Sequence, residues 1–130
     1  MNRQEFTERL EAFGFPKSEY MILSGGSLLL RGLREETQDF DLCVSKDLAK
    51  RLDLQHCAKD EKGYYAPFPD VQMTDNLGSR PFDVVDGFQC ETLESVLALK
   101  RELMRPKDLK DIEVIEAALR KDTAGKDGTT

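Results

Sequence analysis

Two aspartates separated by a single residue, Asp39 and Asp41, are the side chains in this chain best suited to hold a divalent cation. Polar and apolar residues alternate over residues 39 to 45, so this segment is predicted to be a strand with both carboxylates on one face. Adjacent carboxylates repel each other unless a cation lies between them. Mg²⁺ is usually held by one or two carboxylates together with substrate phosphates. The alternative is an exposed polar face on an edge strand.

A glycine-rich segment, Ser24-Gly25-Gly26-Ser27, follows the apolar residues 21 to 23 and indicates a strand that turns into a helix. Helix N-termini carry unpaired N–H groups and partial positive charge, and glycine lets a phosphate approach them. Ser27 is expected to cap this helix and to donate its hydroxyl to a phosphate oxygen. Because the turn is expected at the surface, Gly26→Val is expected to block nucleotide binding and spare the fold. The alternative is an ordinary turn, and no Walker A spacing follows.

A third carboxylate is expected from Asp83, in the short apolar segment of residues 81 to 85. An acid between buried neighbours needs a partner or a role. Asp86, which precedes Gly87, fits a turn residue better. The alternative for Asp83 is a salt bridge with a nearby Arg or Lys.

Basic side chains gather in residues 100 to 110 of this otherwise acidic chain: Lys100, Arg101, Arg105, Lys107 and Lys110. The functional interpretation is that Lys100 or Lys107 neutralises a triphosphate. The alternative is a solvated pair of amphipathic helices, since apolar residues recur at helical spacing after Pro106.

The remaining pattern predicts an α+β domain over residues 1 to 121, with a small mixed sheet flanked by helices, and a disordered polar tail over residues 122 to 130. Helices are expected at 2–13, 27–33, 46–53, 91–104 and 106–121. Strands are expected at 20–25, 39–45 and 80–86, with irregular strands within 62–79. Ser45 is a plausible cap for the third helix.

The composition is that of one folded domain of 130 residues, 39% hydrophobic and 34% charged. A net charge of −6 argues against broad, sequence-independent nucleic-acid binding, which needs a strongly basic surface. The three cysteines form no CxxC pair and no signal peptide is evident, so we expect a reduced cytoplasmic protein. No apolar stretch has membrane-spanning length.

These motifs together resemble the DNA polymerase β superfamily of nucleotidyltransferases, in particular its minimal bacterial members and the nucleotidyltransferase toxins of abortive-infection systems. The resemblance spans roughly residues 20 to 118. It rests on the following matches: Gly25-Gly26-Ser27 for the turn, Arg31-Gly32-Leu33-Arg34 and Thr37 before the acid pair, Asp39 and Asp41 for the pair, Asp83 for the third acid, and Arg105 to Asp108 with Asp111-Ile112 for the C-terminal element. Residues 53 to 80 match nothing in the family pattern.

The resemblance implies transfer of a nucleoside monophosphate from a nucleoside triphosphate to an acceptor hydroxyl on an antibiotic, a protein side chain or a tRNA end. It implies that Asp39, Asp41 and Asp83 bind Mg²⁺, or Mn²⁺ in its place. It also implies that Gly25, Gly26 and Ser27 bind the nucleotide, with Gly26 and Ser27 gripping the leaving pyrophosphate. The alternative is a catalytically inactive member that binds a nucleotide or a protein partner, such as a toxin–antitoxin component.

Overall fold

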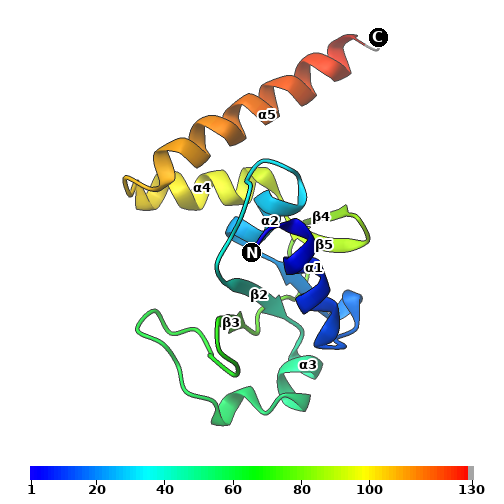
Figure 1. Ribbon diagram of the computed structural model, residues 1–130, viewed down its shortest axis with the longest axis vertical. Coiled ribbons are helices and arrows are strands. Elements are labelled where there is room, and N and C mark those ends of the chain that lie inside the picture. The colour runs from blue at the N-terminus through cyan, green and yellow to red at the C-terminus, as the bar shows by residue number, and fades with distance from the viewer. Residues whose placement is uncertain (129–130) are drawn as a thin grey trace. The chain divides into compact units, whose positions relative to one another are not determined.

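The computed structural model describes the backbone of residues 1 to 128 and the side chains of residues 1 to 121. The chain divides into two compact units, Met1–Glu91 and Thr92–Thr130. The first unit contains the sheet and the second contains the helices α4 and α5 (Figure 1). Within the described residues, no helix combines the length and apolar character needed to cross a membrane.

The first unit is built on a five-stranded mixed sheet, so the predicted α+β class with a mixed sheet is confirmed. The strand order is β3-β2-β1-β5-β4, with β3 and β4 at the two edges. The β1–β2 and β4–β5 pairs are antiparallel, whereas β1–β5 and β2–β3 are parallel. The strands are β1 (Tyr20–Ile22), β2 (Phe40–Val44), β3 (Val71–Thr74), β4 (Phe82–Val85) and β5 (Phe88–Glu91).

Three α-helices accompany the sheet: α1 (Arg3–Ala12), α2 (Ser24–Leu30) and α3 (Lys46–Arg51). All three contribute side chains to the main core cluster, in which Phe6 of α1 stacks on Phe40 of β2 with ring centroids 4.7 Å apart. The Ser45 hydroxyl accepts a hydrogen bond from the Leu48 N–H, as predicted for the cap of α3. Two short 3₁₀ turns, Lys17–Glu19 and Leu54–His56, complete the helical elements of this unit.

The opposite face of the sheet carries a smaller buried cluster of Met21, Cys43 and Leu77. Asp41 precedes Cys43 by two positions on β2, so its side chain points to this same face. The sheet therefore has a helix-covered core face and a second face that carries the Asp41 carboxylate.

The largest differences from the sequence prediction in the first unit are the start of α2 and the presence of β5. Helix α2 begins at Ser24 rather than at residue 27, so the glycines lie inside its first turn. Strand β5 was not predicted; it follows a tight turn at Asp86 and Gly87, both of which have positive φ angles, 52° and 84°. Asp-Gly with positive φ at both positions is the preferred two-residue hairpin turn, so β4 and β5 form a hairpin.

The second unit is a helical hairpin of α4 (Leu93–Leu103) and α5 (Asp108–Gly128) (Figure 1). Thr92 caps α4, because its hydroxyl accepts a hydrogen bond from the Ser95 N–H. Helix α5 continues past the predicted end at residue 121. A disordered tail was predicted for residues 122 to 130. Residues 129 and 130 lie outside the part of the chain that the structure describes.

Candidate functional site

The Asp39–Asp41 pair is the most distinctive polar feature of the first unit. Asp41 lies within β2, where its carbonyl accepts a hydrogen bond from the N–H of Leu23, the N-cap residue of α2. Burial raises the pKa of the Asp41 carboxyl above its usual value, and the nearby charge of Asp39 raises it further. The two carboxylates therefore lie close enough to repel each other, at a point next to the start of α2.

Other charges act on Asp41 as well. Glu91 and Asp60 raise the pKa of Asp41, while the Lys62 ammonium lowers it. The net field at Asp41 is negative, which is the condition under which a bound cation stabilises a carboxylate pair.

Asp83 lies on the other face of the sheet, which corrects the prediction that it joins Asp39 and Asp41. Register pairs join Leu42 to Ile22, Ile22 to Cys90, and Cys90 to Asp83. Cross-strand partners share a face, so Asp83 is on the Leu42 face, whereas Asp41 is on the opposite one. Three strand intervals of about 4.8 Å also separate the two strands, roughly 14 Å in all.

The partner of Asp83 is Arg31, whose guanidinium Nη2 is 2.6 Å from the Asp83 carboxylate. This is the salt bridge that the sequence left open as the alternative. Asp83 is 55% exposed, because β4 is an edge strand and its apolar neighbours Phe82 and Val84 are themselves exposed. Among the described residues, no group of three or more His, Cys, Asp or Glu side chains could hold a metal ion.

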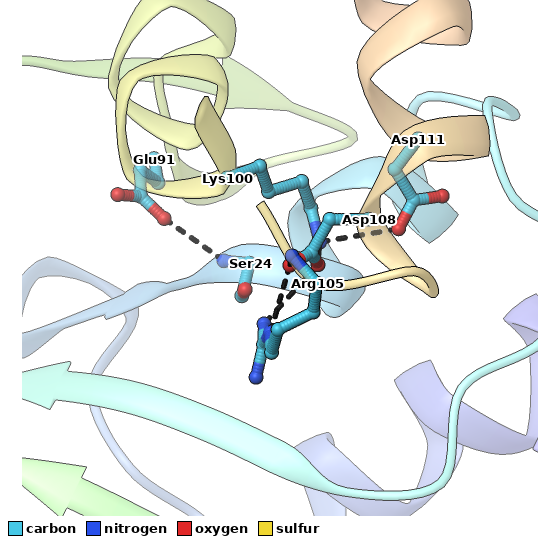
Figure 2. A network of polar contacts seen from close by, with 6 residues as sticks. All are labelled: Ser24, Glu91, Lys100, Arg105, Asp108 and Asp111. Carbon is cyan, nitrogen blue, oxygen red and sulfur yellow. Dashed lines mark hydrogen bonds and ion pairs between the residues drawn. The ribbon is translucent and has the colours of Figure 1, made fainter. Parts of the chain in front are cut away.

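Glu91 is the acid near Asp41 that the sequence analysis missed. It follows Cys90 directly and so points to the Asp41 face. Glu91 is 5% exposed, and its carboxylate accepts a hydrogen bond of 2.9 Å from the Ser24 N–H at the start of α2 (Figure 2). Arg80 lies 3.5 Å from the other carboxylate oxygen. The signal that could have revealed it is the Asp86-Gly87 turn, which predicts a second hairpin strand ending at residue 91.

Ser27 does not cap α2, whose N-cap residue is Leu23. Ser27 lies within the helix, is fully buried, and its hydroxyl donates a hydrogen bond of 2.9 Å to the Glu91 carbonyl. The Arg31 guanidinium contacts the same hydroxyl and donates to the same carbonyl at 3.0 Å. Ser27 therefore joins α2 to β5, and the expectation that it donates to a phosphate is wrong.

The two glycines have different surroundings. A Cβ at Gly26 would lie 2.7 Å from Phe6 Cζ and 2.8 Å from Ile22 Cγ2, inside the core. The expectation that Gly26 lies on a surface turn is therefore wrong. A Cβ at Gly25 would instead meet the Arg34 guanidinium and the Thr37 hydroxyl. Gly25, unlike Gly26, therefore lies next to polar groups in the first turn of the helix.

In the second unit, Lys100 is 5% exposed and lies between two carboxylates (Figure 2). Its ammonium is 3.2 Å from Asp108 Oδ1 and 3.1 Å from Asp111 Oδ2. Arg105 also contacts Asp108, through Nε at 2.7 Å and Nη2 at 3.1 Å. Lys100 thus links α4 to α5. Lys107 is exposed, and its predicted role in triphosphate binding stays a prediction.

A cavity of about 470 Å³ borders Asp39 on the β3 side. Its lining comes from the first unit: Asp39, Asp60, Ala66, Pro67, Phe68, Pro69, Asp70, Val71 and Gln72. Gln72 is the register partner of Asp41 on β3. The segment of residues 53 to 80, which matched no pattern in the sequence, therefore forms most of this cavity.

Comparisons of the chain with models of protein families, with curated proteins and with solved structures find no match. The class defined by the fold and the site is an α+β protein with a five-stranded mixed sheet, a repelling aspartate pair at the start of β2 and a cavity beside Asp39.

Asp41→Asn is expected to raise the melting temperature by a few degrees at pH 7 without divalent ions. The pKa of Asp41 is raised in the folded state, so ionisation of this carboxyl opposes folding. The resulting loss of stability is complete above the folded-state pKa and absent below the ordinary value of 3.8. The gain should therefore shrink as the pH falls to about 3. Thermal melts followed by circular dichroism at several pH values test this. Glu61→Gln, at an exposed acid, is the control, and a neutral-pH melting temperature at or below wild type would contradict the prediction.

Proposed function

We propose that this protein is a Mg²⁺-dependent nucleotidyltransferase with a nucleotidyltransferase-like fold, moving a nucleoside monophosphate from a nucleoside triphosphate to an acceptor hydroxyl. The observation that carries the proposal is the Asp39–Asp41 pair beside the start of α2, where burial and mutual repulsion raise the pKa of Asp41. Two carboxylates with substrate phosphates are the usual environment of Mg²⁺ in proteins. The proposed setting is the cytoplasm, in keeping with three free thiols.

In the proposed reaction, the acceptor oxygen bonds to the α-phosphorus while the bond to the α,β-bridging oxygen breaks. Pyrophosphate leaves, and the hydroxyl proton passes to solvent. Asp39 and Asp41 would hold Mg²⁺, which supplies charge neutralisation for the triphosphate. N–H groups in the first turn of α2, at Gly25 and Gly26, lack intrahelical acceptors and would face the phosphate charge.

Mg²⁺-dependent triphosphate binding tests this function. Isothermal titration with non-transferable α,β-imido analogues of the four nucleoside triphosphates is expected to show binding in Mg²⁺ and none in EDTA. Asp39→Asn and Asp41→Asn should each weaken binding by about tenfold or more, a loss of about 1.4 kcal/mol. Glu61→Gln serves as the control for charge alone. Equal affinity with and without Mg²⁺, or undiminished binding by both variants, would refute the proposal.

A second candidate function is a catalytically inactive member that binds a nucleotide or a protein partner, for example within a toxin–antitoxin pair. The observation that favours it is the position of Asp83, which leaves the pair without a third carboxylate from β4. The two candidates differ in turnover. Pyrophosphate release from a hydrolysable triphosphate, dependent on an added acceptor, identifies the transferase, and Mg²⁺-dependent binding without release identifies the inactive member.

A further inference from the structure

Glu91 is a buried acid that the proposed reaction does not use. It ends β5 and is 5% exposed, although acids are rarely buried unless they are paired. Both of its carboxylate oxygens have partners: the Ser24 N–H donates to Oε1 at 2.9 Å, and Arg80 Nη2 lies 3.5 Å from Oε2 (Figure 2). The first of these contacts joins β5 to the start of α2.

The residue at the other end of this hydrogen bond, Ser24, has an unfavourable backbone conformation. Its φ of 53° lies in the left-handed region, which residues with a Cβ rarely adopt. Such strain persists only where the surroundings hold it in place. Leu23, the N-cap residue of α2, provides no side-chain hydrogen bond to the helix. The Glu91 carboxylate therefore supplies the acceptor that a capping side chain supplies at other helices.

The same turn lies against the strand that carries Asp41. The Leu23 N–H donates to the Asp41 carbonyl at 2.8 Å, and the next N–H along the chain, that of Ser24, donates to Glu91. Strand β1, which leads into this turn, lies between β2 and β5 in the sheet. Two consecutive N–H groups of the turn are thus held from opposite sides.

The main chain of Glu91 is fixed separately from its side chain. Its carbonyl accepts hydrogen bonds from the Ser27 hydroxyl at 2.9 Å and from Arg31 Nη1 at 3.0 Å. Neither bond involves the carboxylate. A substitution at residue 91 is therefore expected to release Ser24 and to leave the contact between α2 and β5 in place.

We propose that Glu91 is a positioning residue: its carboxylate holds Ser24, and thereby keeps the turn between β1 and α2 in the shape that a metal-bound triphosphate at Asp41 requires. The role in nucleotide binding rests on the proposed nucleotidyl transfer, whereas the hold on Ser24 rests on the structure alone. A triphosphate bound through a metal ion at Asp41 would lie beside this turn, because Leu23 is bonded to Asp41. Glu91 itself contacts neither the nucleotide nor the ion and acts through Ser24.

Amide exchange measures the hold on Ser24 without any ligand. In the full chain, NMR is expected to show a protected Ser24 N–H in wild type and in Glu91→Gln, which keeps an oxygen acceptor. Glu91→Leu should exchange this proton about tenfold faster. It should still fold, since Arg80, its lost partner, is 31% exposed and can reach water. Equal protection in wild type and Glu91→Leu would overturn the proposal. So would a wild-type Ser24 N–H that exchanges as fast as an exposed one, whether or not the variant folds.

Rescue by glycine tests the role in nucleotide binding. In isothermal titration with Mg²⁺ and the non-transferable triphosphates, Glu91→Leu is expected to bind about tenfold more weakly than wild type. Glu91→Gln should stay within about threefold, because it keeps the acceptor. Ser24→Gly, added to Glu91→Leu, should restore most of the affinity, since glycine adopts the left-handed region without support. Lower stability alone would not be repaired in this way. A Glu91→Gln variant as weak as Glu91→Leu, or a loss that Ser24→Gly does not reduce, would overturn the positioning role.

Failure of this proposal is distinguishable from failure of the proposed function. If wild type binds triphosphate with Mg²⁺ and Asp41→Asn does not, the function stands, and undiminished binding by Glu91→Leu then overturns the role of Glu91 alone. If wild type shows no Mg²⁺-dependent binding, the proposed function fails, and the role of Glu91 in nucleotide binding fails with it. Amide exchange at Ser24 decides the structural part in either case.

Discussion

An Asp108→Ala protein is expected to lose about 3–5 kcal/mol of stability, because breaking a buried ion pair leaves the remaining charges without compensation. Asp108 is 1% exposed and contacts both Lys100 and Arg105 through its carboxylate. Urea unfolding followed by the helical signal at 222 nm measures the loss. The control is Glu116→Ala, whose partner Arg101 is exposed, and it should cost under about 1 kcal/mol.

The same contacts also determine how the stability of the protein is expected to depend on pH. Hydrogen bonds from Arg105, and then from Lys100, hold the pKa of Asp108 well below its ordinary value of 3.8. Because the pKa is lowered in the folded state, ionised Asp108 stabilises the fold fully when the pH is above the ordinary pKa value. This stabilisation is lost as the pH falls toward the folded-state pKa. Wild type should therefore lose its advantage over Asp108→Ala below about pH 4. A difference that stays constant from pH 7 to 3 would contradict this account of the hairpin.

Gly26→Val is expected to cost about 3 kcal/mol, since extra methyl groups in a packed core force their neighbours to move. The added Cβ would lie 2.7 Å from the ring of Phe6, which is fully buried and stacked on Phe40. Thermal and urea unfolding measure the loss. Any nucleotide-binding defect of this variant must then be read together with its stability.

Gly25→Ala is the matched variant, one position away in the same helical turn. Its Cβ would meet mainly the Arg34 guanidinium, the far end of a flexible side chain. A cost under about 1 kcal/mol is expected, offset in part by the better helix propensity of alanine. Equal losses for the two variants would mean that the core contact of Gly26 is not the cause.

The sequence predicted the elements with strong periodicity. Helix α1, the Ser45 cap of α3 and the alternating strand β2 were all evident from residue pattern, whereas the predicted strand face of Asp39 stays a prediction because β2 begins at Phe40. These features depend on local spacing, which a single sequence displays directly.

The features that could not be predicted depend on the order of the strands in the sheet and on which strands lie at its edges. Asp83 has apolar neighbours, and apolar neighbours suggest burial, but β4 lies at the edge, where Val84 is 66% exposed. Strand β5 is too short to show its own period, so Glu91 was taken as the start of a helix. Gly26 was predicted to bind a phosphate. A phosphate and the Phe6 ring can each approach the backbone closely only where there is no side chain, so the glycine alone does not distinguish the two.

The position of β5 also sets an order for folding during synthesis. Strand β1 pairs with β2, its neighbour in sequence, but its other edge pairs with β5, and the Ser24–Glu91 bond spans 67 residues. Until residue 91 leaves the ribosome, that edge of β1 has no partner and can pair with other chains. Contacts of such long sequence separation tend to close late, so we expect completion of the sheet to be a slow step of folding. Nascent chains that end before residue 91 therefore expose an unpaired sheet edge.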